Sequence, residues 1–341
     1  MASSARPVEF GLCESDYDAL GPFAAAGLRA TELVLARAAE ALSQGRIPIS
    51  GAVVIRTASG ELLDLTVGQN GRIPPPSEHA EEQEGDSANA GYPTDHGETG
   101  ALRQIQDASA VDWQNAVFAT SLAPCVMCFR SIEWLWSLGL RRVVVAQCQS
   151  CGGFGGTVDR VAALEGMAVA RLHNRRGEAM MKRFARTFPW DWAADIGEVP
   201  PADLSLLRRL QTDRTALAPR LLAEVRRSGK QAGVFLPPDG RAAAMADDDR
   251  PSSGGNEVRS AAMQAMGLAG SAVNLREAVV VVLVRPGSSQ LNLQAFGRVS
   301  LGAFELFRPA ALLTDAPVEA ELSSLLGAAG VEVVACGEVA G

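Results

Sequence analysis

The 341-residue sequence contains only six cysteines, three histidines and 5% aromatic residues. Cysteines this sparse exclude a disulfide scaffold, and two pairs have the C-x-x-C spacing that intracellular proteins use for metal or redox chemistry. No apolar run reaches the length that spans a bilayer, and the N-terminus lacks the basic and apolar segments of a secretory signal. The net charge of -8 opposes sequence-independent nucleic-acid binding. We therefore expect a cytoplasmic enzyme with a small substrate and no membrane partner, and a nucleic-acid partner is disfavoured.

The order of apolar patterns predicts two α/β domains joined by a helical segment. A helix is expected over 24–43, and apolar runs at 47–55 and 62–67 predict a hairpin. Strands then alternate with helices as far as residue 187, which predicts a sheet with helices on its faces. Residues 73–95 are Pro-rich, acidic and aperiodic, and we expect them to form a mobile lid. The predicted boundaries are 1–200 for a catalytic domain, 201–232 for a helical linker and 233–341 for a non-catalytic domain.

The second domain resembles a degenerate copy of the first. Glu257 and Pro286 have nearly the same separation as Glu98 and Pro124, and similar apolar patterns surround both pairs. The pairing of the two copies places three residues opposite the metal-ligand positions described below: Gly255, Gly287 and Gln290. On this pairing the second copy has lost every metal ligand. The alternative to a duplication is that two α/β domains share a similar pattern by chance.

Four residues of the first domain can form a catalytic zinc site. Such a site needs three protein ligands, an open position for water and a nearby carboxylate that moves protons. Cys125 and Cys128 lie three apart at a predicted helix start and share one helical face, while His96 lies at another helix start. Glu98 is the predicted proton carrier and not a ligand. This H-x-E and P-C-x-x-C pattern is typical of zinc deaminases.

The sequence gives less reason to assign a function to four other histidines and cysteines. His79 begins a second H-x-E, but it lies inside the acidic loop, and we expect it to be solvated. His173 is expected at the surface. Cys148 and Cys151 follow a predicted strand without further unassigned ligands, so a structural or incidental role is favoured and their function stays open.

The first domain resembles the cytidine-deaminase-like superfamily, and within it fungal cytosine deaminases, over about residues 28–198. The likeness is carried by GRIPISGAVV, GQN, HGE, APCVMC and MKRFARTFPWDWAADIGE. It implies a three-layer α/β fold, here duplicated, and zinc as the cofactor. It also implies that Asn70 binds the pyrimidine edge, that the N–H of Gly97 adds a polar contact, that Trp192 packs on the base, and that Asp195 accepts from its amine.

The resemblance implies hydrolytic deamination of a small amino-heterocycle, with cytosine as the preferred substrate. Guanine, a nucleoside or another amino-heterocycle is the alternative within this class. A tRNA-editing deaminase with a fused non-catalytic subunit and a zinc-binding module without turnover are alternatives of other classes. Since the sheets of this superfamily dimerise, the second domain is expected to take the partner's place in an intramolecular pseudo-dimer, and further homo-oligomers stay open.

Overall fold

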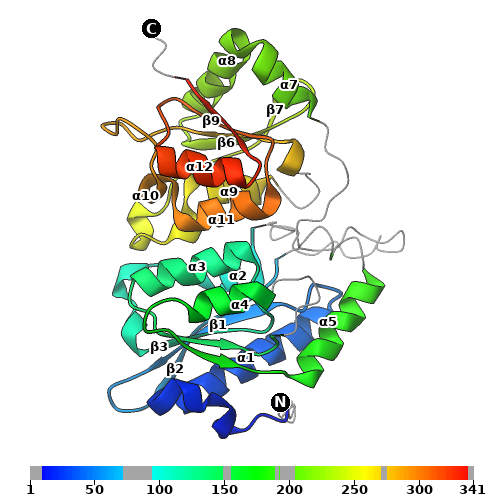
Figure 1. Ribbon diagram of the computed structural model, residues 1–341, viewed down its shortest axis with the longest axis vertical. Coiled ribbons are helices and arrows are strands. Elements are labelled where there is room, and N and C mark those ends of the chain that lie inside the picture. Colours follow the sequence, from blue (N-terminus) through cyan, green and yellow to red (C-terminus); the bar gives the residue numbers. More distant parts are fainter. Residues whose placement is uncertain are drawn as a thin grey trace, which may run out of the picture.

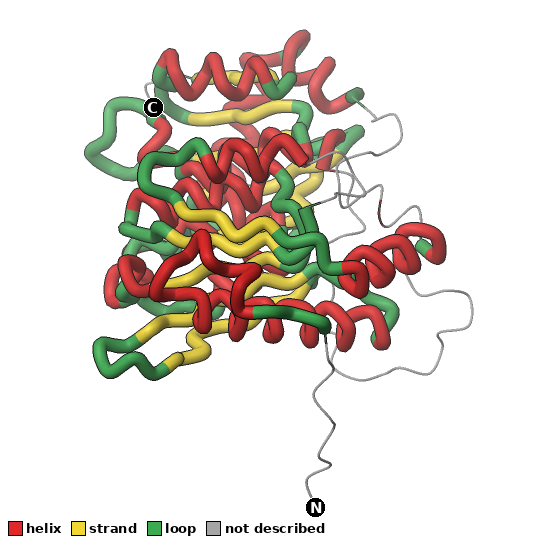
Figure 2. Tube along the Cα trace, turned by 60° about the horizontal axis from the view of Figure 1, so that its bottom comes forward, coloured by secondary structure: helices red, strands yellow, loops and turns green. Residues whose placement is uncertain are grey.

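The computed structural model describes residues 10–71, 94–148, 155–188, 192, 204–269 and 275–336. Within these ranges the chain forms two α/β units, which lie one above the other along the long axis of the molecule (Figure 1). Each unit is built around a five-stranded sheet that has helices on both faces. In the tilted view of Figure 2 the strands lie between these helical layers.

The first sheet has the strand order β2-β1-β3-β4-β5. Strand β1 is antiparallel to β2 and β3, whereas β3, β4 and β5 are parallel. Side chains alternate between the two faces, so that Ala52 and Val54 enter one core cluster and Val53 enters the other. The strands are Ser50–Arg56 (β1), Leu62–Gln69 (β2), Ala116–Thr120 (β3), Arg142–Val145 (β4) and Ala168–Arg171 (β5).

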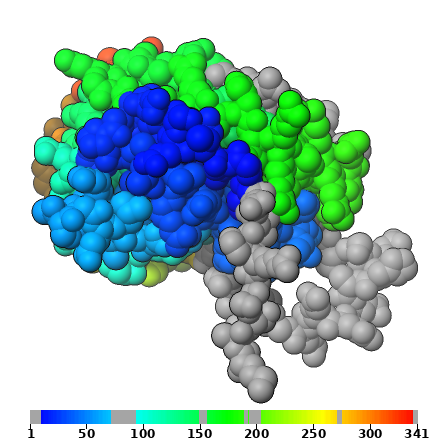
Figure 3. Space-filling view, turned by 90° about the horizontal axis from the view of Figure 1, so that it is seen from below, coloured from blue at the N-terminus to red at the C-terminus, as the bar shows by residue number. Residues whose placement is uncertain are grey.

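The helices of the first unit divide between the two faces of its sheet. η1, α1 and α5 cover one face, and α2, α3 and α4 cover the other. Figure 3 looks onto the first of these faces, where the chain from η1 to α1 is blue. The helices are Glu14–Phe23 (η1), Ala24–Ser43 (α1), Gly97–Arg103 (α2), Val126–Ser137 (α3), Gly155–Ala162 (α4) and Arg175–Thr187 (α5), with short 3-10 turns at Ala108–Ala110 and Trp113–Asn115.

The second sheet repeats the first, with the order β10-β9-β8-β6-β7 and the same strand directions. Its strands are Ala232–Leu236 (β6), Arg241–Ala246 (β7), Val279–Val282 (β8), Ala311–Thr314 (β9) and Glu332–Ala335 (β10). Its helices are Ser205–Thr212 (α7), Arg214–Arg227 (α8), Glu257–Arg259 (η6), Ala261–Leu268 (α9), Leu293–Phe296 (α10), Arg298–Phe307 (α11) and Ala320–Ala328 (α12), with 3-10 turns at Pro251–Ser253 and Leu275–Glu277. The expected duplication of the fold is therefore confirmed.

The two units share one continuous hydrophobic core, in which α3 of the first unit packs against α11 of the second. Gly302 makes this close approach possible, because a Cβ at this position would lie 2.8 Å from the Cα of Met127. Arg130 of α3 forms an ion pair with Glu305 of α11 at 2.7 Å. The side-chain amide of Asn256 donates to the carbonyl of Leu102, at the end of α2, at 2.9 Å. The interface thus combines apolar packing with hydrogen bonds to the main chain.

Two sequence-based expectations differ from the observed fold. The apolar pattern predicts a helix from about Glu98 to Asp107, whereas α2 ends at Arg103 after about two turns. The segment expected as a helical linker contains two helices, which break at Asp213 and pack on the second sheet through residues such as Leu221. This segment therefore also supplies a layer of the second unit.

The helical segment Glu14–Ser43 is long and apolar enough, by length and composition alone, to cross a membrane. The expectation concerned uninterrupted apolar runs, so this segment does not contradict it. Charged residues such as Arg29 and Glu32 interrupt the apolar run, which hides the segment when uninterrupted runs are sought. In the structure, Ala30 and Val34 belong to the core beneath the first sheet.

Candidate metal centre

The predicted ligands lie at the starts of two helices that meet at the first sheet. His96 is the N-cap of α2, Cys125 is the N-cap of α3, and Cys128 lies one turn into α3. Helix α2 approaches β1 so closely that a Cβ on Gly97 would lie 2.3 Å from the Cα of Ser50. Glycine is required at this position because any larger residue would push α2, and with it His96, away from the sheet.

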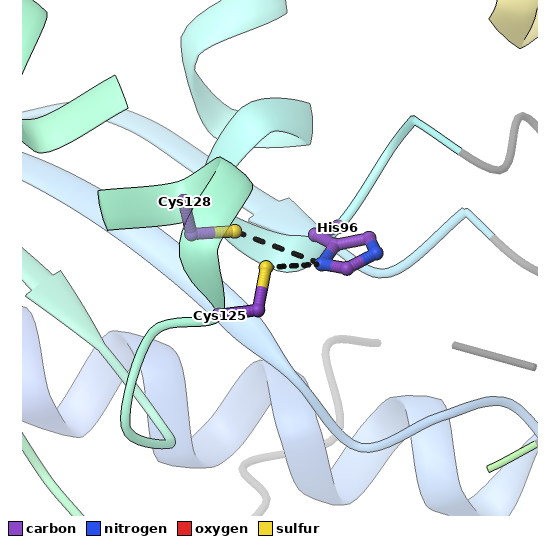
Figure 4. Close-up of side chains that lie close together, drawn as sticks. All are labelled: His96, Cys125 and Cys128. Carbon is purple, nitrogen blue, oxygen red and sulfur yellow. Dashed lines mark hydrogen bonds between the residues drawn. The ribbon is translucent and has the colours of Figure 1, made fainter. Parts of the chain in front are cut away.

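The three ligand atoms converge, as Figure 4 shows. The Nδ1 atom of His96 lies 3.3 Å from the sulfur of Cys125 and 3.6 Å from the sulfur of Cys128. Tetrahedral zinc with bonds of about 2.3 Å to sulfur and about 2.0 Å to nitrogen requires a nitrogen–sulfur separation of about 3.5 Å. The side chains are therefore arranged at the spacing that a zinc ion needs.

Glu98 lies beside this cluster without being part of the three-ligand set. Its Oε2 is 3.3 Å from the sulfur of Cys128, and its Oε1 accepts a hydrogen bond from the hydroxyl of Thr120 at 2.6 Å. The side chain is almost fully buried. Thr120, the last residue of β3, therefore holds the carboxylate beside the ligands.

The electrostatics of the site favour a bound cation. Burial opposes ionisation of the Cys125 thiol, but the hydrogen bond with Cys128 and the charge of His96 hold its pKa well below its usual range. Burial raises the pKa of the Cys128 thiol, and interactions with Cys125 and Glu98 raise it further. Burial, followed by the charge of Cys125, also raises the pKa of the Glu98 carboxyl. Three acidic groups this close ionise together only when a positive charge lies among them, so the donor set fits zinc.

The second unit contributes to the surroundings of His96. The ring of Phe307, the last residue of α11, meets the His96 ring edge to face, with 6.3 Å between centroids. The hydroxyl of Thr94 also lies 3.4 Å from the carbonyl oxygen of Met263 in α9. Contacts from both units therefore restrain the segment that carries the metal ligand.

The residues predicted to bind substrate are only partly within the described structure. Asn70 is buried at the end of β2, and its N–H donates to the carbonyl of Ile49 at 2.8 Å. Trp192 is buried in a cluster that includes Ile49 and Leu122. Gly97 opens α2. Asp195 lies outside the described residues.

The other candidates do not join the metal cluster within the described residues. His173 is exposed, in agreement with its expected surface position. Cys148 is partly buried, with its sulfur 3.8 Å from the carbonyl of Val145. Cys151, His79 and nearly all of the predicted lid lie outside the described ranges.

Helix starts correct the predicted pairing of the two units. Helix α9, the counterpart of α2, has Ser260 as its N-cap, and α11, the counterpart of α3, has Gly297. Ser300, three residues after Gly297, therefore corresponds to Cys128, and its hydroxyl meets that of Ser260 at 2.7 Å.

The positions predicted to replace the ligands, Gly255, Gly287 and Gln290, lie in loops instead. The pairing failed because the chain between β8 and α11 is longer than the chain between β3 and α3 and includes the short helix α10. With the corrected pairing, Glu98 corresponds to Ala262, so this unit carries neither the ligands nor the carboxylate.

Sequence reasoning missed Thr120 and Phe307. Thr120 lies near the end of a predicted strand, a few residues before the P-C-x-x-C motif. This position could have indicated that its side chain lies close to the metal site. Phe307 had no such signal, because its role depends on the packing of α11 on α3.

Comparisons of the sequence with known proteins agree with this ligand set. Residues 28–147 match the cytidine and deoxycytidylate deaminase zinc-binding region. The chain is similar to a cytosine deaminase of Candida albicans, with 26% identity over 167 residues that make up 49% of this chain and 94% of the relative. A solved structure from a study of A-to-I editing by tRNA:A34 deaminases is also similar, with 19% identity and a TM-score of 0.28, over 42% of this chain and 97% of that one.

The His/Cys/Cys ligand set lies within residues 28–147, the part of the chain that matches the deaminase zinc-binding region. These two sequence matches support a relationship between the first unit and the cytidine-deaminase-like superfamily.

Proposed function

We propose that this protein catalyses the hydrolytic deamination of a small amino-heterocycle, and that cytosine, converted to uracil and ammonia, is the preferred substrate. The main support is the buried group of His96, Cys125 and Cys128, with the Glu98 carboxylate 3.3 Å from the sulfur of Cys128. A closed structural site would need a fourth ligand and no proton carrier, so a binding module without turnover is the weaker alternative.

The proposed chemistry divides between the cofactor and Glu98. His96, Cys125 and Cys128 would hold the zinc ion, which would lower the pKa of a bound water molecule toward neutrality. Glu98 would take one proton from water and pass it to the ring nitrogen as the water oxygen bonds to the amine-bearing carbon. It would then take the proton of the new hydroxyl group and pass it to the amine, so that the carbon–nitrogen bond breaks and a carbonyl group forms. Water and the amino compound thus yield a carbonyl product and ammonia. Thr120 keeps Glu98 oriented during both transfers.

The preference for cytosine rests on the similarity to the Candida albicans cytosine deaminase and on the predicted substrate residues. We propose that Asn70 binds the edge of the base, that the N–H of Gly97 adds a polar contact, that Trp192 packs on the ring and that Asp195 accepts from the amine. Guanine, a nucleoside or another amino-heterocycle is the alternative. A tRNA substrate is the alternative of a different class, and the chain's net charge of -8 counts against it.

We further propose that the second unit acts as the non-catalytic partner in an intramolecular pseudo-dimer, within domain boundaries near residues 200 and 233. Support comes from the repeated strand order, the packing of α11 on α3 and the contact of Phe307 with His96. The chain would then need no second copy to complete its site. A cytoplasmic location stays a prediction.

The test is ammonia release by the purified, zinc-loaded full chain from cytosine, cytidine, guanine and adenine, with an adenosine-containing tRNA anticodon stem-loop as a further arm. We expect cytosine to give the highest kcat/KM and one zinc per chain. Release from another heterocycle alone would replace the proposed substrate. Release only from the RNA would move the protein to the editing class, and no release from any arm would favour the binding module.

Glu98→Gln tests the role of the carboxylate. It should retain zinc and lower kcat by about a hundredfold to ten-thousandfold, because proton transfer is lost while the shape of the side chain is kept. Glu61→Gln, an exposed residue in a turn, is the matched control and should behave as the parent. Near-normal turnover in Glu98→Gln would remove this residue from the mechanism.

Thr120→Val tests the positioning of Glu98. Loss of the hydrogen bond to a charged group should lower kcat by about tenfold to a hundredfold without loss of zinc. Thr120→Ser keeps the hydroxyl and should restore most of the activity. An equal defect in both variants would assign Thr120 to packing instead.

A further inference from the structure

The second unit contains a cavity of about 600 Å³ at the carboxyl end of β8. Its lining includes Val282, the last residue of this strand, and Ser260 and Ala262 at the start of α9. These correspond to the strand end and helix start that form the metal centre of the first unit. Its volume falls in the range of roughly 300–1,000 Å³ that is typical of small-molecule sites.

One part of the cavity wall is a built ion network. Asp248, whose side chain is only 4% exposed, pairs with Arg250 at 2.5 Å and with Arg285 at 2.8 Å. Arg250 is also fixed by a hydrogen bond to the carbonyl of Ala295 at 2.6 Å. Arg285 is 44% exposed and makes its ion pair through one terminal nitrogen, so its other N–H groups can donate to a molecule in the cavity.

Glu257 supplies a carboxylate to the same wall. The N–H of Val299, at the start of α11, donates to its Oε2 at 3.0 Å, which fixes the side chain. The cavity is thus lined by two carboxylates and two guanidinium groups, whose formal charges cancel. A site of this composition favours an uncharged ligand that both donates and accepts hydrogen bonds over a free anion or cation.

The apolar part of the wall suits a flat ring. Val282, Leu291 and Phe296 are all buried and line the cavity. An aromatic side chain beside aliphatic ones can pack on the face of a heterocycle, while polar groups read its edge.

We propose that this cavity is a second, non-catalytic binding site for a nucleoside whose base carries both an amino group and a carbonyl group, such as cytidine or guanosine. The amino group donates to Glu257, the carbonyl accepts from Arg285, and the ring packs on the apolar wall. Because Ala262 and Ser260 stand where the first unit has Glu98 and His96, a molecule bound here is not deaminated. The site therefore extends the function of the chain beyond its catalytic centre.

The test is isothermal titration of the zinc-loaded full chain carrying Glu98→Gln, which prevents turnover, with cytidine, guanosine, uridine and cytidine monophosphate. We expect saturable binding of cytidine or guanosine, with uridine at least about tenfold weaker because it lacks the amine, and the monophosphate weaker than its nucleoside. Equal binding of cytidine and uridine would overturn the proposed role of Glu257. Absence of saturable nucleoside binding would overturn the site.

Variants of the cavity separate this site from the catalytic one. Arg285→Ala should weaken cytidine binding about tenfold or more, and Arg285→Lys should restore part of it, whereas Arg241→Ala, an exposed arginine of β7, should have no effect. Glu257→Gln should abolish the preference for cytidine over uridine. Binding that survives both cavity variants unchanged would place the nucleoside elsewhere and refute the proposal. Because the cavity variants leave the catalytic centre unchanged, a loss of binding in them is assigned to the cavity whichever substrate the catalytic centre takes.

Discussion

Gly302 offers the sharpest test of how the second unit supports the first. In Gly302→Ala the added Cβ would lie 2.8 Å from the Cα of Met127 and 2.8 Å from the Cγ of Arg130. Non-bonded carbon atoms prefer separations of about 3.5–4.0 Å, so α3 and α11 must move apart by about 1 Å. Overpacking of this kind costs about 1–3 kcal/mol.

Gly327→Ala is a matched control for this substitution. Gly327 also lies in a helix of the second unit, α12, but a Cβ there would meet no atom within 4 Å. Alanine should therefore stabilise this helix by about 0.5–1 kcal/mol, because glycine loses more backbone entropy on folding. The same chemical change is thus expected to have opposite signs at the two sites.

Thermal unfolding of the two variants measures this difference. Units of this size shift their unfolding midpoint by about 2–4 °C per kcal/mol, so Gly302→Ala should unfold several degrees below Gly327→Ala. Since α3 carries Cys125 and Cys128, Gly302→Ala should also lose zinc faster to a chelator. A Gly302→Ala protein as stable as Gly327→Ala, with unchanged zinc retention, would refute the tight packing of the two helices.

Two further predictions concern the metal and the ion network. Phe307→Ala should weaken zinc binding about tenfold to a hundredfold in chelator competition, because the His96 ring loses the side chain that packs against it. Phe307→Leu should recover part of the affinity. Equal affinity in the parent protein and both variants would contradict a role for this contact. Burial raises the pKa of Asp248, but Arg250 and then Arg285 hold this pKa below its usual range. The Asp248 carboxylate therefore stabilises the fold above about pH 4, and this stabilisation is lost as the pH falls through the folded-state pKa. Asp248→Asn should therefore be less stable than the parent protein at pH 7, and its thermal unfolding midpoint should fall less than that of the parent between about pH 5 and pH 2. If the midpoints of the two proteins fell equally with pH, other groups would be responsible for the acid sensitivity.

The first unit was well predicted because its signals are local. Helix α1 has the expected bounds of Ala24–Ser43, and the hairpin of β1 and β2 lies where two short apolar runs indicated it. A helical turn fixes which residues share a face, so the spacing of Cys125 and Cys128 was enough to predict that their sulfurs point the same way. That His96 joins them was predicted from the combination of H-x-E with P-C-x-x-C, which is typical of zinc deaminases.

The second unit shows where local signals end. The order of apolar runs indicated that the second unit is a copy of the first. It did not show which residues of the two units correspond, because the connecting loops differ in length. Ser260 and Ser300 lie 40 positions apart, and only the packing of α9 and α11 brings their hydroxyls together. The cavity lined by Glu257 and Arg285 arises in the same way from separate elements.

The sequence by itself determined the chemistry of the catalytic unit: two thiols, an imidazole and a carboxylate at helix starts, where side-chain type and short spacing decide what can bind. Only the tertiary structure decided that Thr120 holds Glu98, that Phe307 of the other unit packs on His96 and that a glycine lets α11 reach α3. These contacts join residues distant along the chain. Their formation depends on how whole helices and sheets fill the space between them, which no local pattern of residues encodes.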